Sequence, residues 1–323
     1  MARDSRLDGL KFLMIFFVVF GHLGYHNSDL LLSKMIYSFH MPVFIFLSGY
    51  FTSRKDDREK HLKWLKQTLI LYVCAQLGHV LLRLSLDYAT CAFNNKPFET
   101  DYTIKSIFLY PNYALWYLVC LMYWRLSVWT IFKKTNDIKL LILSFVLAIA
   151  SGVVPLDHAF SFQRTFAFYP FFVLGLMFRE RNLMHSLEQV KYGYAIIVLI
   201  LGLIISRYFP TYMPKFHYEN WHQVANRVIQ TLLGLTLCLS IVRLSRFQFM
   251  EKLAKWGTYT LWIYIGHTFL AITGHRIMSE LGYHLNLIVA LLLAAFYCAF
   301  FIGMAKLYHR LKFDKQKKEA LHY

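Results

Sequence analysis

The chain is a series of long apolar runs separated by polar segments that are rich in lysine and arginine. Crossing the roughly 30 Å hydrocarbon core of a membrane takes about twenty apolar residues in a helix, which is the length of most of these runs. Three shorter runs are expected to extend into their flanks. The pattern predicts ten membrane-spanning helices, at residues 7–25, 34–52, 66–87, 113–132, 138–154, 165–178, 192–207, 224–243, 256–275 and 285–308.

The composition agrees with a membrane protein. Hydrophobic residues make up 57% of the 323 residues and charged residues only 16%, whereas soluble domains carry about 25% charged residues. The first run is too long, and too polar at its outer end, for a cleaved signal peptide, and no small-residue cleavage site follows it. We therefore predict an all-α polytopic membrane protein. It has a single transmembrane domain over residues 1–323, of which 310–323 form a basic cytoplasmic tail.

The formal net charge of +17 is spread over alternate loops rather than gathered in one stripe, which argues against nucleic-acid binding. The N-terminal segment through Lys11, the even-numbered loops and the tail from Lys306 hold 25 of the 35 lysines and arginines, whereas the odd-numbered loops hold seven. The remaining three, Arg83, Arg125 and Arg227, fall within the runs. Because loops rich in lysine and arginine stay in the cytoplasm, both termini are predicted to be cytoplasmic.

The first run contains an ionisable pair, Lys11 and His22. The step of eleven residues is three helical turns plus about 20°, so both side chains point the same way, about 16 Å apart along the helix. Ionisable groups in membrane helices are costly and usually face a cavity or a partner, which makes both residues candidates for function. Asp8, three residues before Lys11, is placed to pair with it.

Two further histidines are expected to reach the depth of His22. His40 lies near the outer end of the second run, and His267 lies in the middle or outer half of the ninth. Each of the three can alternatively be a hydrogen-bonded interior residue without a chemical role. No metal site is predicted, because no carboxylate or i,i+4 histidine pair accompanies them.

The polar ends of the runs carry further signals. Lys63 and Lys66 share one helical face in a densely basic cytoplasmic segment and are candidates for binding phosphates, with lipid headgroups as the alternative. The outer loops 88–112 and 208–223 are rich in aromatic and amide side chains, which suit either an aromatic belt or stacking on sugar rings. Ser48-Gly49, at the inner end of the second run, permits close helix contact.

The order of several short motifs resembles the acyltransferase-3 family of membrane O-acyltransferases, in particular its sugar O-acetylase (fucose 4-O-acetylase-like) branch. Lys11, ten residues and then His22 is similar to the Arg/Lys-x10-His signature of that family. The resemblance covers residues 6 to about 270 and includes a bundle of ten helices with both ends inside. Five further segments are similar and in the same order: 39–51, 63–66 with 71–72, 115–118, 168–175 and 261–267.

The resemblance implies transfer of an acyl group, most often acetyl, from cytoplasmic acyl-CoA to a glycan hydroxyl outside the inner membrane of a bacterium. A positioned imidazole is the usual general base for a hydroxyl. His22 takes that role, and His40, His267 or Arg164 orients it or stabilises the oxyanion. Transfer is either direct or through an acyl-histidine. The residues implied in donor binding are Asp8, Lys11, Lys63, Lys66 and Tyr72. Lysine stands where arginine is commoner at 11, 63 and 66, and the two are not equivalent at phosphate sites.

Two other classes of function compete with acyl transfer. A carrier or exporter of a free or lipid-linked glycan would use the histidines as a proton relay. Against it, the sequence shows no internal repeat and no matched pair of broken helices of the kind that transporters carry. A purely structural or sensory membrane subunit would need no chemistry. An enzyme given acyl-CoA and acceptor releases the free coenzyme A thiol, and a carrier does not.

Overall fold

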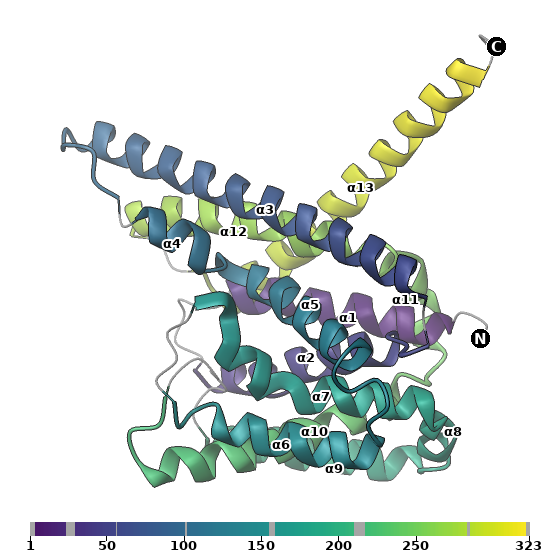
Figure 1. Ribbon diagram of the computed structural model, residues 1–323. Coiled ribbons are helices and arrows are strands. Elements are labelled where there is room, and N and C mark those ends of the chain that lie inside the picture. The colour runs from purple at the N-terminus through teal and green to yellow at the C-terminus, as the bar shows by residue number, and fades with distance from the viewer. Residues whose placement is uncertain are drawn as a thin grey trace. The chain divides into compact units, whose positions relative to one another are not determined.

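The structure is a computed structural model, and it describes residues 4–23, 30–55, 57–100, 102–154, 159–209, 217–282 and 285–320. Every regular element in these ranges is a helix, as predicted. The helices form two compact units (Figure 1). Unit 1 contains Met1–Ser28 and Phe247–Tyr323, and unit 2 contains Asp29–Arg246. Each unit is described separately below.

Each of the ten predicted runs coincides with one helix. Three helices, α3, α10 and α13, are long and apolar enough by themselves to cross a membrane, so the chain is an all-helical membrane protein. Ten crossings and the cytoplasmic position of both termini stay predictions. The ten helices are α1 (Ser5–Leu23), α2 (Leu30–Tyr50), α3 (Arg58–Phe93), α5 (Trp116–Trp129), α6 (Asp137–Ala150), α7 (Phe162–Glu180), α9 (Tyr192–Ser206), α10 (Trp221–Leu244), α12 (Thr260–Glu280) and α13 (Leu287–Ala320).

Helix ends differ from the predicted ends where polar residues continue a helix beyond its apolar run. α3 extends beyond its predicted run at both ends, and α13 continues into the predicted basic tail as far as Ala320. Residues 321–323 of that tail, and residues 210–216 of the second long outer loop, lie outside the described residues. The short elements between the long helices were not predicted. They are α4 (Ile104–Leu109), η2 (Tyr113–Leu115), η3 (Ala159–Ser161), α8 (Leu183–Glu188) and α11 (Phe249–Gly257).

Unit 1 is built on the close contact of α1 and α11. A methyl group on Gly9 would collide with the carbonyl oxygen of Met250, and one on Gly257 would collide with the carbonyl oxygen of Asp8. The two glycines therefore let the helix backbones touch, as small residues do in membrane helix pairs. α12 and α13 pack on α1 and on each other to complete the unit (Figure 1).

Unit 2 is built around α2 and α7. A methyl group on Gly49 would collide with the carbonyl oxygen of Phe172, and one on Gly175 would collide with the carbonyl oxygen of Phe46. The close contact predicted at Ser48-Gly49 is thus present, and its partner is α7. α5 and α6 also pack on α7, α9 and α10 pack on α2 and on each other, and α3 packs on α5.

The ends of the unit 2 helices sort into two groups. Arg54, after α2, lies 3.1 Å from the carboxylate of Asp137 in α6 and 3.6 Å from that of Glu180 in α7. Three loops predicted to be cytoplasmic therefore meet. At the other end, the amide of Tyr218, in the predicted outer loop 208–223, donates to the carbonyl oxygen of Gly152 at 2.6 Å, near the predicted outer end of the run 138–154. These contacts agree with the predicted alternation of the loops, and the side of the membrane on which each group lies stays a prediction.

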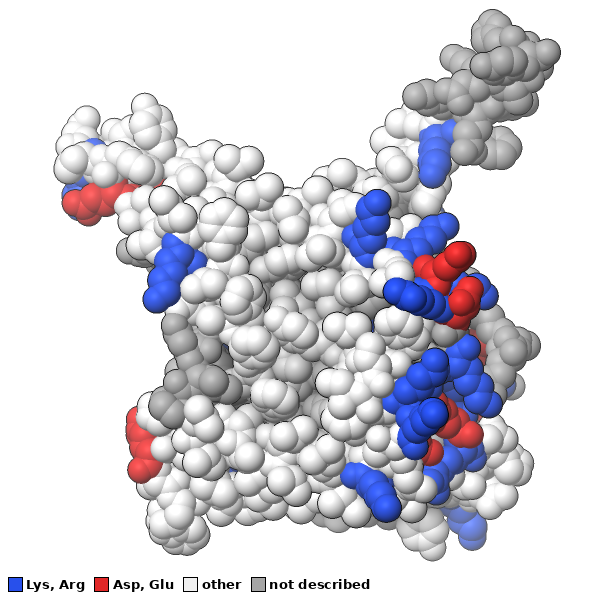
Figure 2. All heavy atoms as spheres, in the orientation of Figure 1, with Lys and Arg blue, Asp and Glu red and all other residues white. Residues whose placement is uncertain are grey.

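Charged side chains are spread unevenly over the face of the molecule that Figure 2 shows. Most lysines and arginines of this view lie on the right, with acidic residues among them, and the middle of the face is uncharged. An uncharged band flanked by cations is expected of a surface that faces lipid.

The α2–α7 contact gives a first prediction. Gly49→Ala places a methyl group against a backbone oxygen that cannot move without its helix, so overpacking should lower the stability of the protein by about 1–3 kcal/mol. Thermal unfolding in detergent measures this as a lower midpoint. Gly193→Ala, in α9, is the matched control, because nothing lies within 4 Å of the added atom. Equal midpoints for the two variants would contradict the close contact.

Candidate active site

Two of the three predicted histidines meet in unit 1. His22, in the last turn of α1, and His267, in α12, approach to 2.9 Å between Nδ1 of His22 and Nε2 of His267. Their rings are nearly parallel, at 16°, with centroids 5.1 Å apart. His267 is completely buried, whereas His22 is half-buried. Side chains 245 residues apart in the chain therefore form one hydrogen-bonded pair, which is called the histidine dyad below.

The backbone determines which nitrogen of each neutral ring carries hydrogen. Nδ1 of His267 lies 2.9 Å from the carbonyl oxygen of Ile263, and a carbonyl oxygen can only accept. Nδ1 of His267 is therefore the donor, and Nε2 of the neutral ring is an acceptor. It follows that Nδ1 of His22 donates to His267, which leaves the basic lone pair of His22 on Nε2.

Lys11 lies on the same helix as the dyad. α1 is continuous from Ser5 to Leu23, so the step of eleven residues holds, and Lys11 and His22 point the same way. Nζ of Lys11 lies 3.0 Å from Oδ1 of Asp8, as predicted. The Asp8 carboxylate is almost fully buried, and the Lys11 side chain keeps 26% of its surface exposed. The aspartate thus holds the ammonium group, which has three hydrogens to donate, at an accessible position.

α11 adds cations and an aromatic ring beside this end of α1, which sequence reasoning missed. Trp256 packs on Phe12 with centroids 5.1 Å apart, and Nζ of Lys255 lies 4.8 Å from the Trp256 ring. Arg6 pairs with Glu251 at 2.7 Å. The signal was present in the sequence, because Met250, Leu253 and Gly257 follow a helical period and are buried, between charged positions.

His40 lies in α2 of unit 2 and is buried. Its Nδ1 is 2.7 Å from the carbonyl oxygen of Ile36, so this nitrogen carries hydrogen. The ring of Tyr37 stands edge-on to it, with centroids 4.9 Å apart. The predicted common depth of His40 and His22 stays a prediction, because the two residues belong to different units.

Arg164 is held against an aromatic platform at the start of α7. Its Cζ lies 5.1 Å from the ring centroid of Trp116, and Trp116 stacks on Phe168 at 5.3 Å. The helix starts after two residues in the left-handed region, Phe160 at φ 52° and Ser161 at φ 57°. Such residues cost roughly 1–3 kcal/mol each, and here they set the direction in which α7 begins, three residues before Arg164.

The predicted donor-site residues of unit 2 all lie on α3. Lys63 and Lys66 are both exposed in its first turns, and Tyr72 is half-buried further along. Between the lysines, Trp64 turns toward α5 and lies under the guanidinium of Arg125. The prediction missed this Trp64–Arg125 contact, because helical periodicity identifies faces but does not say which faces meet.

Comparison with known proteins assigns the chain to a family. The family model of the acyltransferase domain matches residues 4–305. The chain belongs to this acyltransferase family. It is also 30% identical, over 194 residues, to the nodulation protein NolL of Sinorhizobium fredii, a match that covers 55% of this chain and 49% of NolL. The chain therefore spans about half the length of that curated relative. No solved structure matches the chain.

The family match extends over both units and so includes every predicted site residue of this acyltransferase. Four of them lie in unit 1 as two separate pairs, the Asp8–Lys11 ion pair on α1 and the histidine dyad between α1 and α12. The other five are in unit 2: His40, Lys63, Lys66, Tyr72 and Arg164.

Proposed function

We propose that this protein is a membrane O-acyltransferase of the bacterial inner membrane. It moves an acyl group, most simply acetyl, from cytoplasmic acyl-CoA to a hydroxyl group of a glycan on the outer side. The observation that carries the proposal is the histidine dyad. The carbonyl oxygen of Ile263 determines which nitrogen of His267 carries hydrogen, and His267 in turn determines which nitrogen of His22 is basic. Membership of the acyltransferase family supports the class of chemistry.

The dyad suits the activation of a hydroxyl group. A sugar hydroxyl is a poor nucleophile at neutral pH, and an imidazole with an ordinary pKa near 6.5 is a good general base there. Nε2 of His22 accepts the proton, and the resulting imidazolium keeps its Nδ1 hydrogen bond to His267. Because His267 is buried and fixed to α12 by its own backbone contact, it holds the ring of His22 in one orientation and one tautomer.

A single base can account for every proton that moves in acyl transfer. The hydroxyl proton passes to Nε2 of His22 while the hydroxyl oxygen forms a bond to the thioester carbonyl carbon. The carbon–sulfur bond then breaks, and the sulfur leaves with the proton that His22 has held. The products are the O-acyl glycan and free coenzyme A. Arg164, a strong hydrogen-bond donor, stays the candidate for stabilising the oxyanion. A neutral His40 already donates its one ring hydrogen to the carbonyl oxygen of Ile36 and has none left for that role.

The anionic end of the donor needs cations on the cytoplasmic side. Lys11, held by Asp8, lies on the same face of α1 as His22 and about 16 Å from it along the helix, so an extended thioester can reach the dyad while its phosphates lie at Lys11. Lys63, Lys66 and Tyr72, on α3 of unit 2, stay the further residues that the family resemblance implies in donor binding. Acyl-CoA is a substrate here and not a resident cofactor.

Thiol release tests the proposal directly. Purified protein in lipid vesicles receives acetyl-CoA together with a surface polysaccharide of the bacterium that produces the protein. Free thiol is then measured with a disulfide reagent. We expect thiol release that depends on both substrates, with acetyl groups appearing on the polysaccharide by mass spectrometry. Glycan that crosses the vesicle membrane without thiol release would instead indicate a carrier and overturn the proposal.

Lys11 is expected to bind the acyl donor. Lys11→Ala removes an accessible cation and is expected to raise the KM for acetyl-CoA about tenfold, the loss of one charge-assisted hydrogen bond, with a small effect on kcat. Lys11→Arg keeps the charge and should keep most of the affinity. Lys105→Ala, which removes a lysine from α4 on the predicted outer side, is the control. An unchanged KM in Lys11→Ala would remove this residue from the donor site.

A further inference from the structure

Arg125 has no role in the site described above, yet it lies in α5, within a predicted membrane span. A charged side chain in a membrane helix costs several kcal/mol unless it reaches water, a headgroup or a partner. The structure places its Cζ 3.8 Å from the ring centroid of Trp64, which is a close cation–π contact between α5 and α3. The side chain is thus held in one orientation.

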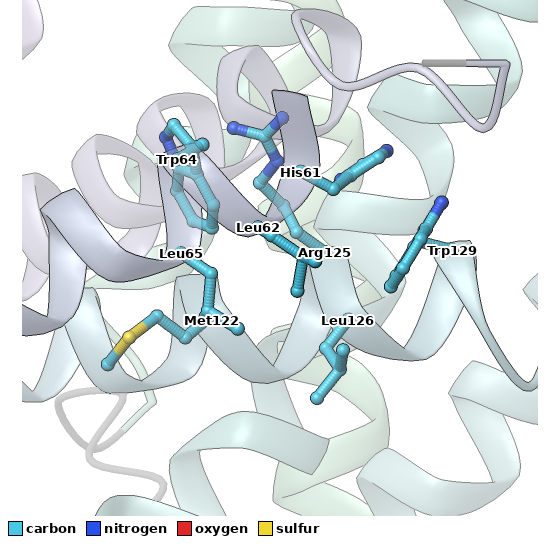
Figure 3. A pocket seen from close by; sticks show the side chains of 8 residues that line it. All are labelled: His61, Leu62, Trp64, Leu65, Met122, Arg125, Leu126 and Trp129. Atoms are coloured by element: carbon cyan, nitrogen blue, oxygen red, sulfur yellow. The ribbon is translucent and has the colours of Figure 1, made fainter. Parts of the chain in front are cut away.

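Arg125 belongs to a groove with a polar rim and an apolar floor. Beside it, the ring of His61 stacks on Trp129, with centroids 4.8 Å apart. Figure 3 shows the nitrogen-bearing ends of Arg125, His61, Trp64 and Trp129 pointing to one side of the groove. The apolar side chains lie on the other side: Leu65, Met122 and Leu126.

The rim of the groove lies at a predicted membrane boundary. His61 is in the first turn of α3 and Trp129 is the last residue of α5, at the end of unit 2 where the predicted cytoplasmic loops meet. Tryptophan is typical of this boundary. The groove opens at the surface of the protein, because Leu62 and Leu126, which line it, are 46% and 40% exposed. Four exposed cations stand in the adjoining segments: Arg58, Lys60, Lys133 and Lys134.

We propose that this groove binds the phosphate of an anionic phospholipid from the cytoplasmic leaflet, with the guanidinium of Arg125 as its principal contact. A guanidinium is suited to bind phosphate through two hydrogen bonds, and basic pockets between membrane helices on this side attract anionic headgroups. The apolar floor accommodates the first part of an acyl chain. Lys63 and Lys66, which are proposed for the donor, flank Trp64 and Leu65 in the same turns of α3, so coenzyme A is included as a competitor in the test.

Native mass spectrometry of the detergent-purified protein tests the site. Phosphatidylglycerol and phosphatidylcholine with the same acyl chains are titrated in parallel. Wild type is expected to retain phosphatidylglycerol preferentially, and Arg125→Gln should raise its apparent Kd about tenfold, the loss of one charge-assisted hydrogen bond. Arg83→Gln is the matched control, because Arg83 makes a comparable contact with Tyr102, at 5.6 Å, in a different part of unit 2. It should retain the lipid as wild type does.

Three results would overturn the proposal. Wild type retains both lipids equally, Arg125→Gln retains phosphatidylglycerol as well as wild type does, or added coenzyme A displaces the lipid and thereby assigns the groove to the donor. If Arg125→Gln does not fold, Arg125→Lys keeps a cation but lacks the planar pair of N–H groups. It should bind phosphatidylglycerol more weakly than wild type, and equal binding would likewise contradict the assignment.

Discussion

His22→Ala is expected to lower kcat/KM for acyl transfer by about 10²–10⁴-fold, the range that a general base contributes. The variant loses Nε2, the only basic nitrogen that the hydrogen bond to His267 leaves on this ring. It should still insert into the membrane and accumulate, because His22 is half-buried at the end of α1 and does not hold α1 against α11. Thiol release, measured with saturating acceptor, reports the loss.

His22→Gln and His309→Gln separate chemistry from structure. Glutamine at 22 keeps a polar side chain that can donate to His267 but is not basic, so it should be as inactive as alanine. His309, an exposed histidine of α13 in the same unit, should tolerate the same change with full activity. Normal acylation by either His22 variant would show that this histidine is structural.

His267→Ala should lower kcat while leaving the KM for acetyl-CoA nearly unchanged, because His267 positions the base and touches neither substrate in the proposed reaction. The loss should be at least about tenfold and less than the roughly 10⁴-fold that follows loss of the orienting residue in a Ser-His-Asp triad. Alanine leaves Nδ1 of His22 without its acceptor and lets the ring turn or change tautomer.

His267→Gln provides the rescue. The side-chain oxygen of glutamine can accept the Nδ1 hydrogen of His22, so this variant should recover a large part of kcat relative to His267→Ala. His267→Leu, which fills the buried site without an acceptor, should not. If glutamine and leucine gave equal rates, the hydrogen bond would have no part in catalysis, and His267 would serve packing alone.

The site within unit 1 was largely predictable from sequence. A straight helix has a known period, so Lys11 and His22 had to share a face, and Asp8 had to lie within reach of Lys11. The meeting of His22 and His267 was expected as a shared depth, and His267 was one of three candidates for orienting His22. Periodicity along α1 could not choose among them, because it does not say which helix a side chain faces. The hydrogen bond from His267 to the carbonyl oxygen of Ile263 could not be predicted from helical periodicity or from depth in the membrane, because it depends on the rotamer that packing selects.

The fold was predictable to the level of its long helices and no further. Apolar runs identify helices that face lipid, but they end where charge begins, whereas α3 starts eight residues before its predicted run through a charged segment with good helix formers. α11 was missed for a related reason. Its nine residues are too few for an apolar run, and its buried positions are separated by charges that lie on the opposite face.

Nitrogen-15 NMR of the imidazole rings in the membrane-reconstituted protein at neutral pH tests the central claim most directly. Difference spectra against His22→Gln and His267→Gln assign the two rings. The account predicts that both neutral rings carry hydrogen on Nδ1 and have an unprotonated Nε2. A His22 ring with hydrogen on Nε2 would have no basic nitrogen directed away from His267, and that result would contradict the proposed mechanism.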